Sequence, residues 1–147
     1  MIYRGILILI LITGGYSSIV TAQELHVAIV KNASGNVEIL RNKTSLSATL
    51  GMQLMRLDKI ITGRGSHAGI TFVDGTLVTV GSSTEIELSK YLFEPKKSNY
   101  DFELYVKKGT AVYSSGKLGK LAPEAVNLAT PRATVGVHGT RLIIKVD

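Results

Sequence analysis

The chain contains no cysteine, so it can form no disulfide framework and has no attachment site for a lipoprotein anchor. It also lacks an uninterrupted apolar run of the ~20 residues that a membrane-spanning helix needs. Exported proteins without disulfides are common in bacteria and less usual among small secreted eukaryotic domains. Together with the export signal described next, the absence of cysteine favours a protein of the bacterial envelope.

Residues 1–22 have the pattern of a secretory signal peptide. Arg4 gives the start of the chain a positive charge, the apolar run Ile6 to Ile12 follows, and the small residue Ala22 ends a Val-Thr-Ala boundary. We expect cleavage after Ala22, which leaves residues 23–147 as one mature periplasmic or secreted domain. The alternative is an uncleaved anchor, which Gly and Ser residues within the apolar stretch disfavour.

Acidic side chains are few, with 11 Asp and Glu against 17 Lys and Arg. Arg4 is the only charged residue of the expected signal peptide, so the mature chain carries 16 − 11 = +5. The lysines occur as scattered pairs without interleaved aromatic residues, which disfavours nucleic-acid binding. A solvated basic surface and a salt-sensitive attraction to anionic envelope polymers both fit this distribution.

Apolar and polar residues alternate with a period of two, which indicates strands with one face in a core and one in water. Runs of this kind are residues 68–73, 85–89, 101–107 and 141–146, and further strands are expected around residues 27–30 and 37–40. Turn residues separate them at 32–36, 74–75 and 81–83, and loops are expected at 94–99 and 113–123. One segment differs, because Leu50, Leu54, Leu57 and Ile61 have helical spacing. It predicts a short helix between Leu50 and Asp58, which Gly51 weakens.

The dipeptide Gly-Thr recurs at residues 75–76, 109–110 and 139–140, and each copy is expected to open a strand. With many short strands in one mature chain, this recurrence predicts a single all-β domain. A small β-solenoid with short stacked strands is the leading architecture. A sandwich or an open barrel is the alternative.

Two glycine-rich stretches, residues 62–76 and 130–140, share a Thr-x-Arg start and a Gly-Thr near the end. We expect their residues to shape the backbone. Glycines permit positive φ or close backbone approach, aspartates bond to their own turns, and a proline sets the start of a strand. The residues assigned to these structural roles are Asp58, Gly63, Asp74, Gly75, Thr76, Pro131, Gly136, Gly139 and Thr140.

The sequence contains no strong signal of a catalytic site. Ser66 and His67 are adjacent, so on a strand they point to opposite faces and cannot pair as nucleophile and base. The three histidines, His26, His67 and His138, lack the spacing of metal ligands. The alternative is that Asp58, Asp74 and His67 together form a functional site, but acidic residues beside glycines usually form hydrogen bonds within turns. We expect no catalysis, no metal and no cofactor.

The motifs, taken in order, resemble the FecR domain, the periplasmic part of the ferric-citrate regulator. The matching segments are Gly35-Asn36-Val37, Gly51 with Leu54, Asp58 to Gly63, Gly65-Ser66, Ala68, Phe72 to Thr76, Glu85-Ile86, Gly109, Thr130 to Val137, and Gly139-Thr140. The resemblance spans nearly all of the mature chain. It implies an all-β extracytoplasmic domain without enzymatic activity, of the kind that passes information from an outer-membrane receptor to a cytoplasmic sigma factor.

Two departures from that family stand out. The regulators carry a cytoplasmic anti-sigma segment and a membrane helix ahead of the domain, where this chain has the expected signal peptide. His138 occupies the position at which the family usually has arginine, and Leu142 one at which it often has an aromatic residue. These differences put any inherited ligand contact near His138 in doubt.

Three functional hypotheses follow. The leading one is a non-catalytic signalling or scaffold module that binds a protein partner in the envelope through exposed strand edges or loops. The second is a module for cell-wall glycan or another anionic polymer, with stacking faces supplied by Tyr91, Phe93, Tyr100, Tyr105 and Tyr113. The alternative is that these aromatic side chains pack in the core or flank a loop, as we expect for Phe93 and Phe102. An envelope hydrolase is the weakest of the three.

Overall fold

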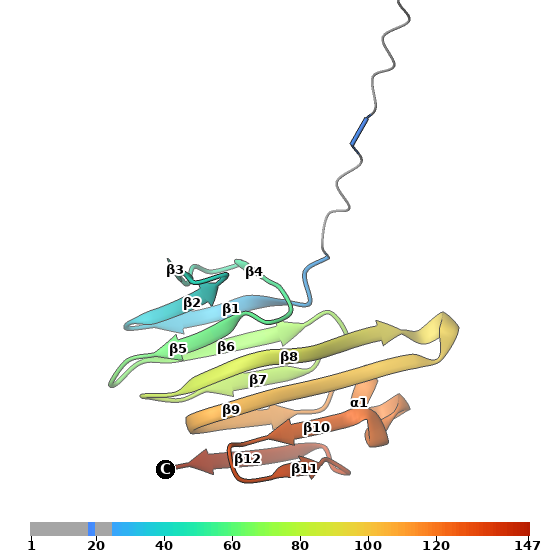
Figure 1. Ribbon diagram of the computed structural model, residues 1–147. Coiled ribbons are helices and arrows are strands. Elements are labelled where there is room, and N and C mark those ends of the chain that lie inside the picture. The colour runs from blue at the N-terminus through green and yellow to red at the C-terminus, as the bar shows by residue number, and fades with distance from the viewer. Residues whose placement is uncertain (1–17, 20–24) are drawn as a thin grey trace, which may run out of the picture.

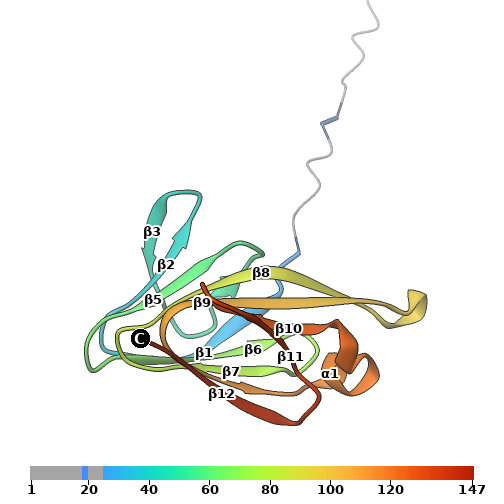
Figure 2. The same ribbon diagram turned by 60° about the horizontal axis from the view of Figure 1, so that its bottom comes forward.

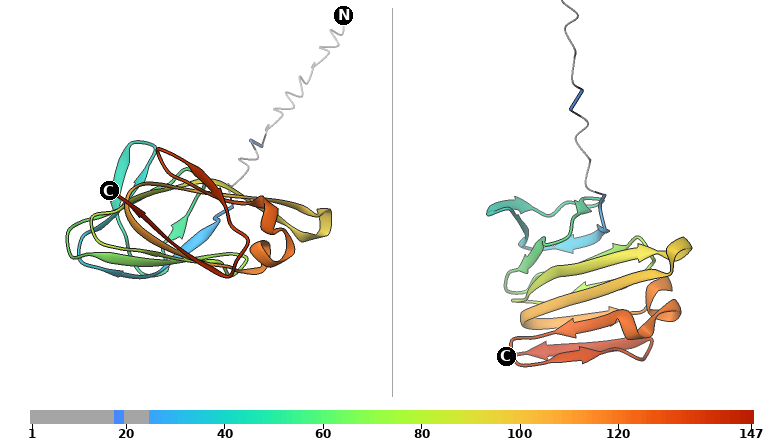
Figure 3. Two further views of the ribbon diagram at one scale, coloured as in Figure 1. Left: turned by 90° about the horizontal axis from the view of Figure 1, so that it is seen from below. Right: turned by 45° about the vertical axis from the view of Figure 1, so that its right-hand side comes forward.

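The computed structural model describes residues 18–19 and 25–147 (Figure 1). The expected signal peptide and its cleavage site therefore lie outside the described residues, apart from residues 18–19. Residues 25–147 contain one twelve-stranded sheet, which curls into an open half-barrel. Seen from below, the curled sheet surrounds a flattened interior (Figure 3). The prediction of a single all-β domain is confirmed.

The curl gives the sheet two layers, named here as they lie in Figure 1. The rear layer consists of β1 (Ala28–Ser34), β4 (Gln53–Leu54), β6 (His67–Phe72), β7 (Leu77–Val80), residues 109–114 of β9 (Asn99–Ser114) and β12 (Arg141–Val146). The front layer consists of β2 (Val37–Arg41), β3 (Thr44–Ser47), β5 (Lys59–Thr62), β8 (Glu85–Glu94), residues 99–108 of β9, β10 (Val126–Ala129) and β11 (Thr134–Gly136). The β2–β3 hairpin stands away from the rest (Figure 2).

Neighbouring strands are antiparallel, except for β9 and β10, the one parallel pair among the described strands. In a β-solenoid successive coils would instead stack in parallel. The chain here passes back and forth between the layers, so the open-barrel alternative describes the fold and the solenoid does not. The prediction that each Gly-Thr pair opens a strand is wrong for one copy, because Gly109 and Thr110 lie inside β9.

The core lies between the two layers and is filled by the inward side chains that the alternation predicts. Ala68, Ile70 and Phe72 of β6 are buried from the rear, and Phe102 and Leu104 of β9 from the front. Four aromatic rings form its centre, with centroid separations of 5.1–6.1 Å between the contacting pairs of Phe72, Tyr91, Phe102 and Tyr113. Aromatic contacts of this geometry add to the stability that burial supplies.

The chain passes between layers at four stacked corners along one edge, namely residues 34–37, 63–66, 81–84 and 108–110. Backbone bonds join each corner to the next, such as Gly63 N–H to Asn36 O (2.9 Å) and Gly81 N–H to Thr110 O (2.9 Å). At the last corner, β9 changes layer without a break. Gly109 has a φ of +92° there, and a Cβ at this position would lie 2.6 Å from Thr84 Cα. Glycine is therefore required at that point.

The expected helix between Leu50 and Asp58 is wrong. The segment contains turns and the two-residue strand β4, which pairs with β1. Leu54 is buried, but Leu50 and Leu57 are exposed, so the apolar stripe of a helix is not formed. Positive φ values at Gly51 (+79°) and Leu57 (+70°) also take the backbone out of the helical region.

The loop expected at 113–123 is partly replaced by regular structure. β9 continues to Ser114, and a short helix α1 (Lys117–Leu121) follows, with the 3₁₀ turns η2 (Pro123–Ala125) after it and η1 (Pro95–Lys97) in the β8–β9 connection. Leu118 of α1 is fully buried, so its packing against the core holds a segment whose glycines suggest a loop.

Candidate functional site

Asp74 is the centre of a buried hydrogen-bond network between the two layers. It lies in the β6–β7 turn and is 2 % exposed. Its carboxylate accepts bonds from Thr76 Oγ1 (2.7 Å), Tyr91 Oη (2.7 Å), the Leu118 N–H (3.0 Å) and, at 3.4 Å, the Thr76 N–H. The bond expected from Thr76, two residues further along the chain, is present. Asp74 also connects the β6–β7 turn of the rear layer to β8 of the front layer and to α1.

Tyr91 was not identified as a partner of Asp74 by the sequence pattern. Strict alternation from Leu88 would place Lys90 inside, but a register shift between these two residues turns Tyr91 inward instead. Burial raises the pKa of the Tyr91 hydroxyl far above its usual range, and the hydrogen bond to Asp74 raises this pKa further. The hydroxyl therefore stays protonated and acts as a donor to the carboxylate.

Asp58 is a second buried acid, 1 % exposed, at the turn before β5. Its carboxylate accepts two bonds from the Arg41 guanidinium, from Nε at 2.9 Å and from Nη2 at 2.7 Å, and one from the Met55 N–H at 2.8 Å. Arg41 Nη2 also donates to Gln53 O of β4 (2.9 Å). Asp58 thus bonds to its own turn, as expected, but its backbone partner, Met55, precedes it in the chain. The sequence pattern did not predict the two bonds from Arg41.

The first motif stretch is built into the fold. Gly63 accepts bonds from the Ser66 and Ser83 N–H groups at its corner, and Gly75 has a positive φ of +88° in its turn. Thr76 is fully buried, and its hydroxyl oxygen accepts a 3.3 Å bond from the Gly116 N–H while donating to Asp74. In this stretch, Gly63, Gly75 and Thr76 therefore take part in turns and in contacts between segments of the backbone.

The second motif stretch differs because it is largely exposed. Pro131 lies in the turn from β10 into β11, which Thr130 closes by donating its N–H to Ala133 O (2.8 Å). Gly136 and Gly139 have no positive φ, and a Cβ at either position would meet no atom within 3.4 Å. The expectation that these two glycines are required by backbone geometry is therefore wrong. Thr140 is exposed and accepts a bond from the Ser115 N–H through its carbonyl.

The alternative site of Asp58, Asp74 and His67 is not assembled. His67 begins β6 and Asp74 follows its other end, so extended backbone separates them by roughly 20 Å. Ser66 is buried and accepts a bond from the Asn36 N–H (2.8 Å), while His67 is exposed, as expected for neighbours on opposite faces. Within residues 18–19 and 25–147, no three His, Asp or Glu side chains gather as metal ligands would.

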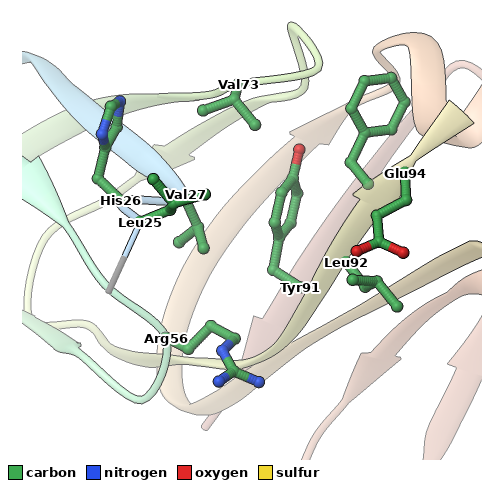
Figure 4. Close-up of a pocket in the computed structure, with 9 residues that line it drawn as sticks. Leu25, His26, Val27, Arg56, Val73, Tyr91, Leu92 and Glu94 are labelled. Carbon is green, nitrogen blue, oxygen red and sulfur yellow. The ribbon is translucent and has the colours of Figure 1, made fainter. Parts of the chain in front are cut away.

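A pocket of about 370 Å³ opens where β8 passes the start of β1 (Figure 4). Its walls are mainly apolar, with Arg56 and Glu94 adding charge. The lining residues are Leu25, His26, Val27, Arg56, Val73, Tyr91, Leu92, Phe93 and Glu94. Its volume suits a small apolar group. The motif residues Asp74 and Thr76 lie outside it, and the Tyr91 hydroxyl is already bonded to Asp74.

Most of the aromatic side chains considered for stacking pack inside the protein, whereas Tyr105 is half-buried at an outward position of β9. Tyr91, Phe102 and Tyr113 are buried in the core, so their faces are unavailable to a sugar. Phe93 and Tyr100 pack against each other with ring centroids 5.9 Å apart and lie against the core. Phe102 thus has the expected core position and Phe93 packs against the core while partly buried, and the arrangement counts against aromatic glycan stacking.

Most of the sequence matches the model of one protein family. The family described as FecR protein matches residues 58–147, and comparisons with curated proteins and with solved structures found no match. The matched range begins at Asp58, so the segments at residues 35–37 and 51–54 lie outside it. No helix among the described residues is long and apolar enough to cross a membrane. Since the match covers more than half of the sequence, the chain belongs to the FecR family.

Proposed function

We propose that this chain is an exported, non-catalytic FecR-like domain that serves as a protein-interaction module in the bacterial envelope, in signalling or as a scaffold. Membership in the FecR family supports an envelope-associated regulatory role. Export depends on the signal peptide expected at residues 1–22, with the mature domain at residues 23–147. N-terminal sequencing of periplasmic protein is expected to begin at Gln23, and an intact Met1 in the membrane pellet would contradict export.

One observation carries the non-catalytic part of the proposal. The two acids among the motif residues, Asp58 and Asp74, are buried and hydrogen-bonded inside the protein. Asp74 receives bonds from two other elements, and Asp58 is held by Arg41. A catalytic acid must instead reach a substrate. The chemistry-bearing motif residues are therefore engaged in holding the layers together.

The substitution Asp74→Asn tests this role. Asn keeps one carbonyl acceptor and adds a donor that the rotating hydroxyls of Thr76 and Tyr91 can accept. We expect a loss of ~1 kcal/mol in the free energy of unfolding, with partner binding and cellular function retained. Thermal denaturation and a growth or signalling assay measure the two effects. Loss of function in a variant that still folds and binds its partner would show that Asp74 acts in chemistry.

The glycan or anionic-polymer function is the weaker proposal. The buried positions of Tyr91 and Tyr113 remove two of its five stacking candidates. Basic residues on the surface still allow electrostatic attraction to a polymer, and co-sedimentation with purified cell wall at low and high salt tests it.

A further inference from the structure

The outer face of the rear layer is a regular field of apolar and hydroxyl side chains. Strand registers across β1, β6, β7, β9 and β12 align the outward residues in rows. One row consists of Ile29, Thr71, Leu77, Ser114 and Arg141, and the next of Asn32, Gly69, Thr79, Val112 and Ile143. Leu77 is 48 % exposed and Ile143 63 % exposed, although both lie on regular strands.

The charges on the rear-layer strands have one sign, and the exposed acid Asp147 directly follows the end of β12. The described rear-layer strands contain no Asp or Glu, and their charged residues are Lys31 in β1 with Arg141 and Lys145 in β12. β1 lies to one side of the field and β12 to the other, so the cations flank an uncharged centre. Such a face complements a surface with an apolar middle and acidic margins.

A hollow near the centre of the field adds a polar feature. Gly69 has no side chain, and the neighbouring strands leave a depression of about 240 Å³ that Thr71, Leu77 and Thr79 also line. Thr71 Oγ1 is buried there and has no hydrogen-bond partner among the described residues.

We propose that the outer face of the rear layer docks a protein partner whose contact surface is an apolar patch edged with carboxylates. The proposal rests on the interaction function proposed above and identifies its surface and the chemistry of its partner. A second copy placed face to face would bring cations against cations, which disfavours self-association through this face. A purely anionic polymer would leave Leu77 and Ile143 without apolar contacts, so the face fits a protein better.

Site-specific photo-crosslinking in the producing cells locates the contact. A photoreactive phenylalanine replaces Leu77 or Ile143 on the rear layer, and Lys90 of the front layer is the control position because its side chain is also exposed. Mass spectrometry then identifies the captured protein and the crosslinked segment. We expect capture from positions 77 and 143 but not from 90, and a crosslinked segment with apolar residues flanked by Asp or Glu.

The other outcomes separate this proposal from the function beneath it. Capture from position 90 alone would overturn the rear-face docking site and leave the interaction function intact. Capture from none of the three positions would contradict both. A crosslinked segment without acidic residues, a second copy of this chain, or attachment to a wall polymer instead of a protein would each overturn the proposed partner chemistry.

Charge reversal with the purified captured protein tests the complementarity. Lys31→Glu combined with Arg141→Glu is expected to raise Kd by about tenfold or more at low salt, with a smaller effect at high salt. Lys96→Glu combined with Lys120→Glu changes the net charge equally at exposed sites in η1 and α1, and should leave Kd within about twofold. Equal effects of the two pairs would show a response to net charge only and would overturn the docking site.

Discussion

The two outer faces of the half-barrel share one core and differ in charge. Outward residues of the front layer include the acids Glu38, Glu85, Glu87 and Glu103. Several pair with lysines, as in Lys59–Glu87 (3.9 Å), Lys90–Glu103 (3.8 Å) and Lys107–Glu85 (3.7 Å). The rear face has cations at its margins and apolar or hydroxyl side chains between them.

This difference shows which part of each strand is constrained by folding. Inward positions of both layers must be apolar, because they bury the same core. Outward positions are free to vary as far as packing is concerned. The front face has the mixed charges of a solvated surface, whereas the rear-layer strands keep exposed Leu77 and Ile143 and contain no acid. This difference is the basis of the proposed docking of a partner on the rear face.

Contacts between the layers hold these unlike faces together at both ends of the strands. Gly109 lets one strand belong to both layers, and the Asp74–Tyr91 bond joins the rear β6–β7 turn to β8. Arg41 of β2 bonds to Gln53 O of β4 as well as to Asp58. If the comparison is right, disruption of these connections will affect stability far more than changes to either outer face.

The largest effect is expected for Gly109→Val. A side chain there would need a φ of +92° and would collide with the Thr84 backbone, so we expect a loss of about 3 kcal/mol or more in the free energy of unfolding. Gly75→Val should cost ~1–3 kcal/mol, because its φ is positive but the space is open.

The matched control is Gly139→Val. Gly139 has neither a positive φ nor a neighbour within 4 Å of an added Cβ, so we expect a change within about 0.5 kcal/mol. Urea denaturation of the three variants measures the series. A Gly139 variant as unstable as the Gly109 variant would show that the corner geometry is not the cause.

Asp74→Leu is expected to have the next largest effect. It removes the acceptor for Tyr91 Oη, Thr76 Oγ1 and the Leu118 N–H in a buried place. Leaving such groups unpaired should cost roughly 3 kcal/mol, against ~1 kcal/mol for Asp74→Asn. Thermal and urea denaturation compare the two. Equal stabilities would mean that the carboxylate network does not connect the layers energetically.

Alkaline pH should weaken the same connection. The pKa of Tyr91 is raised in the folded protein above its ordinary value of 10.0, so the folded chain retains a proton that the unfolded chain loses. Stability is therefore complete below pH ~10 and decreases above it, by up to ~1.4 kcal/mol per pH unit for this group.

The control for this dependence is Tyr91→Phe, which has no ionisable hydroxyl. Its free energy of unfolding should be lower at neutral pH but should fall less steeply between about pH 10 and 11. Burial also raises the pKa of Tyr113, so some dependence will remain. Identical slopes in the wild-type protein and the variant would contradict the role assigned to Tyr91.

The smallest effects are expected on the front face. Lys59→Gln or Lys107→Gln breaks an exposed ion pair and should change the free energy of unfolding by no more than about 0.5 kcal/mol. Arg41→Gln is the contrasting variant, because it leaves Asp58 buried beside a neutral side chain, at a cost of ~3 kcal/mol. Chemical denaturation at low and high salt measures both, and a large effect at Lys59 or Lys107 would mean that the front-face charges stabilise the fold.

Much of the fold was predictable because its signals are local. Alternation in residues 68–73 and 101–107 identified strands and their inward faces, and the turn at Asp74-Gly75 was evident from two residues. The segment at 50–58 was misread because leucine spacing resembles a helix over a few residues, whereas β4 forms through pairing with distant β1. The solenoid prediction failed for a related reason, since a recurring dipeptide does not state the direction of neighbouring strands.

The sequence by itself determined that this chain forms an all-β domain of the FecR family, that Asp74, Gly75 and Thr76 shape a turn, and that Asp58 serves a turn. Only the tertiary structure decided that Asp74 meets Tyr91, that Arg41 holds Asp58, and that the acid-free strands lie together on one face. Alternation and turn chemistry act between near neighbours in the chain. Partners 17 residues apart, as in both of these bonds, are joined by strand pairing and register shifts that no local pattern specifies.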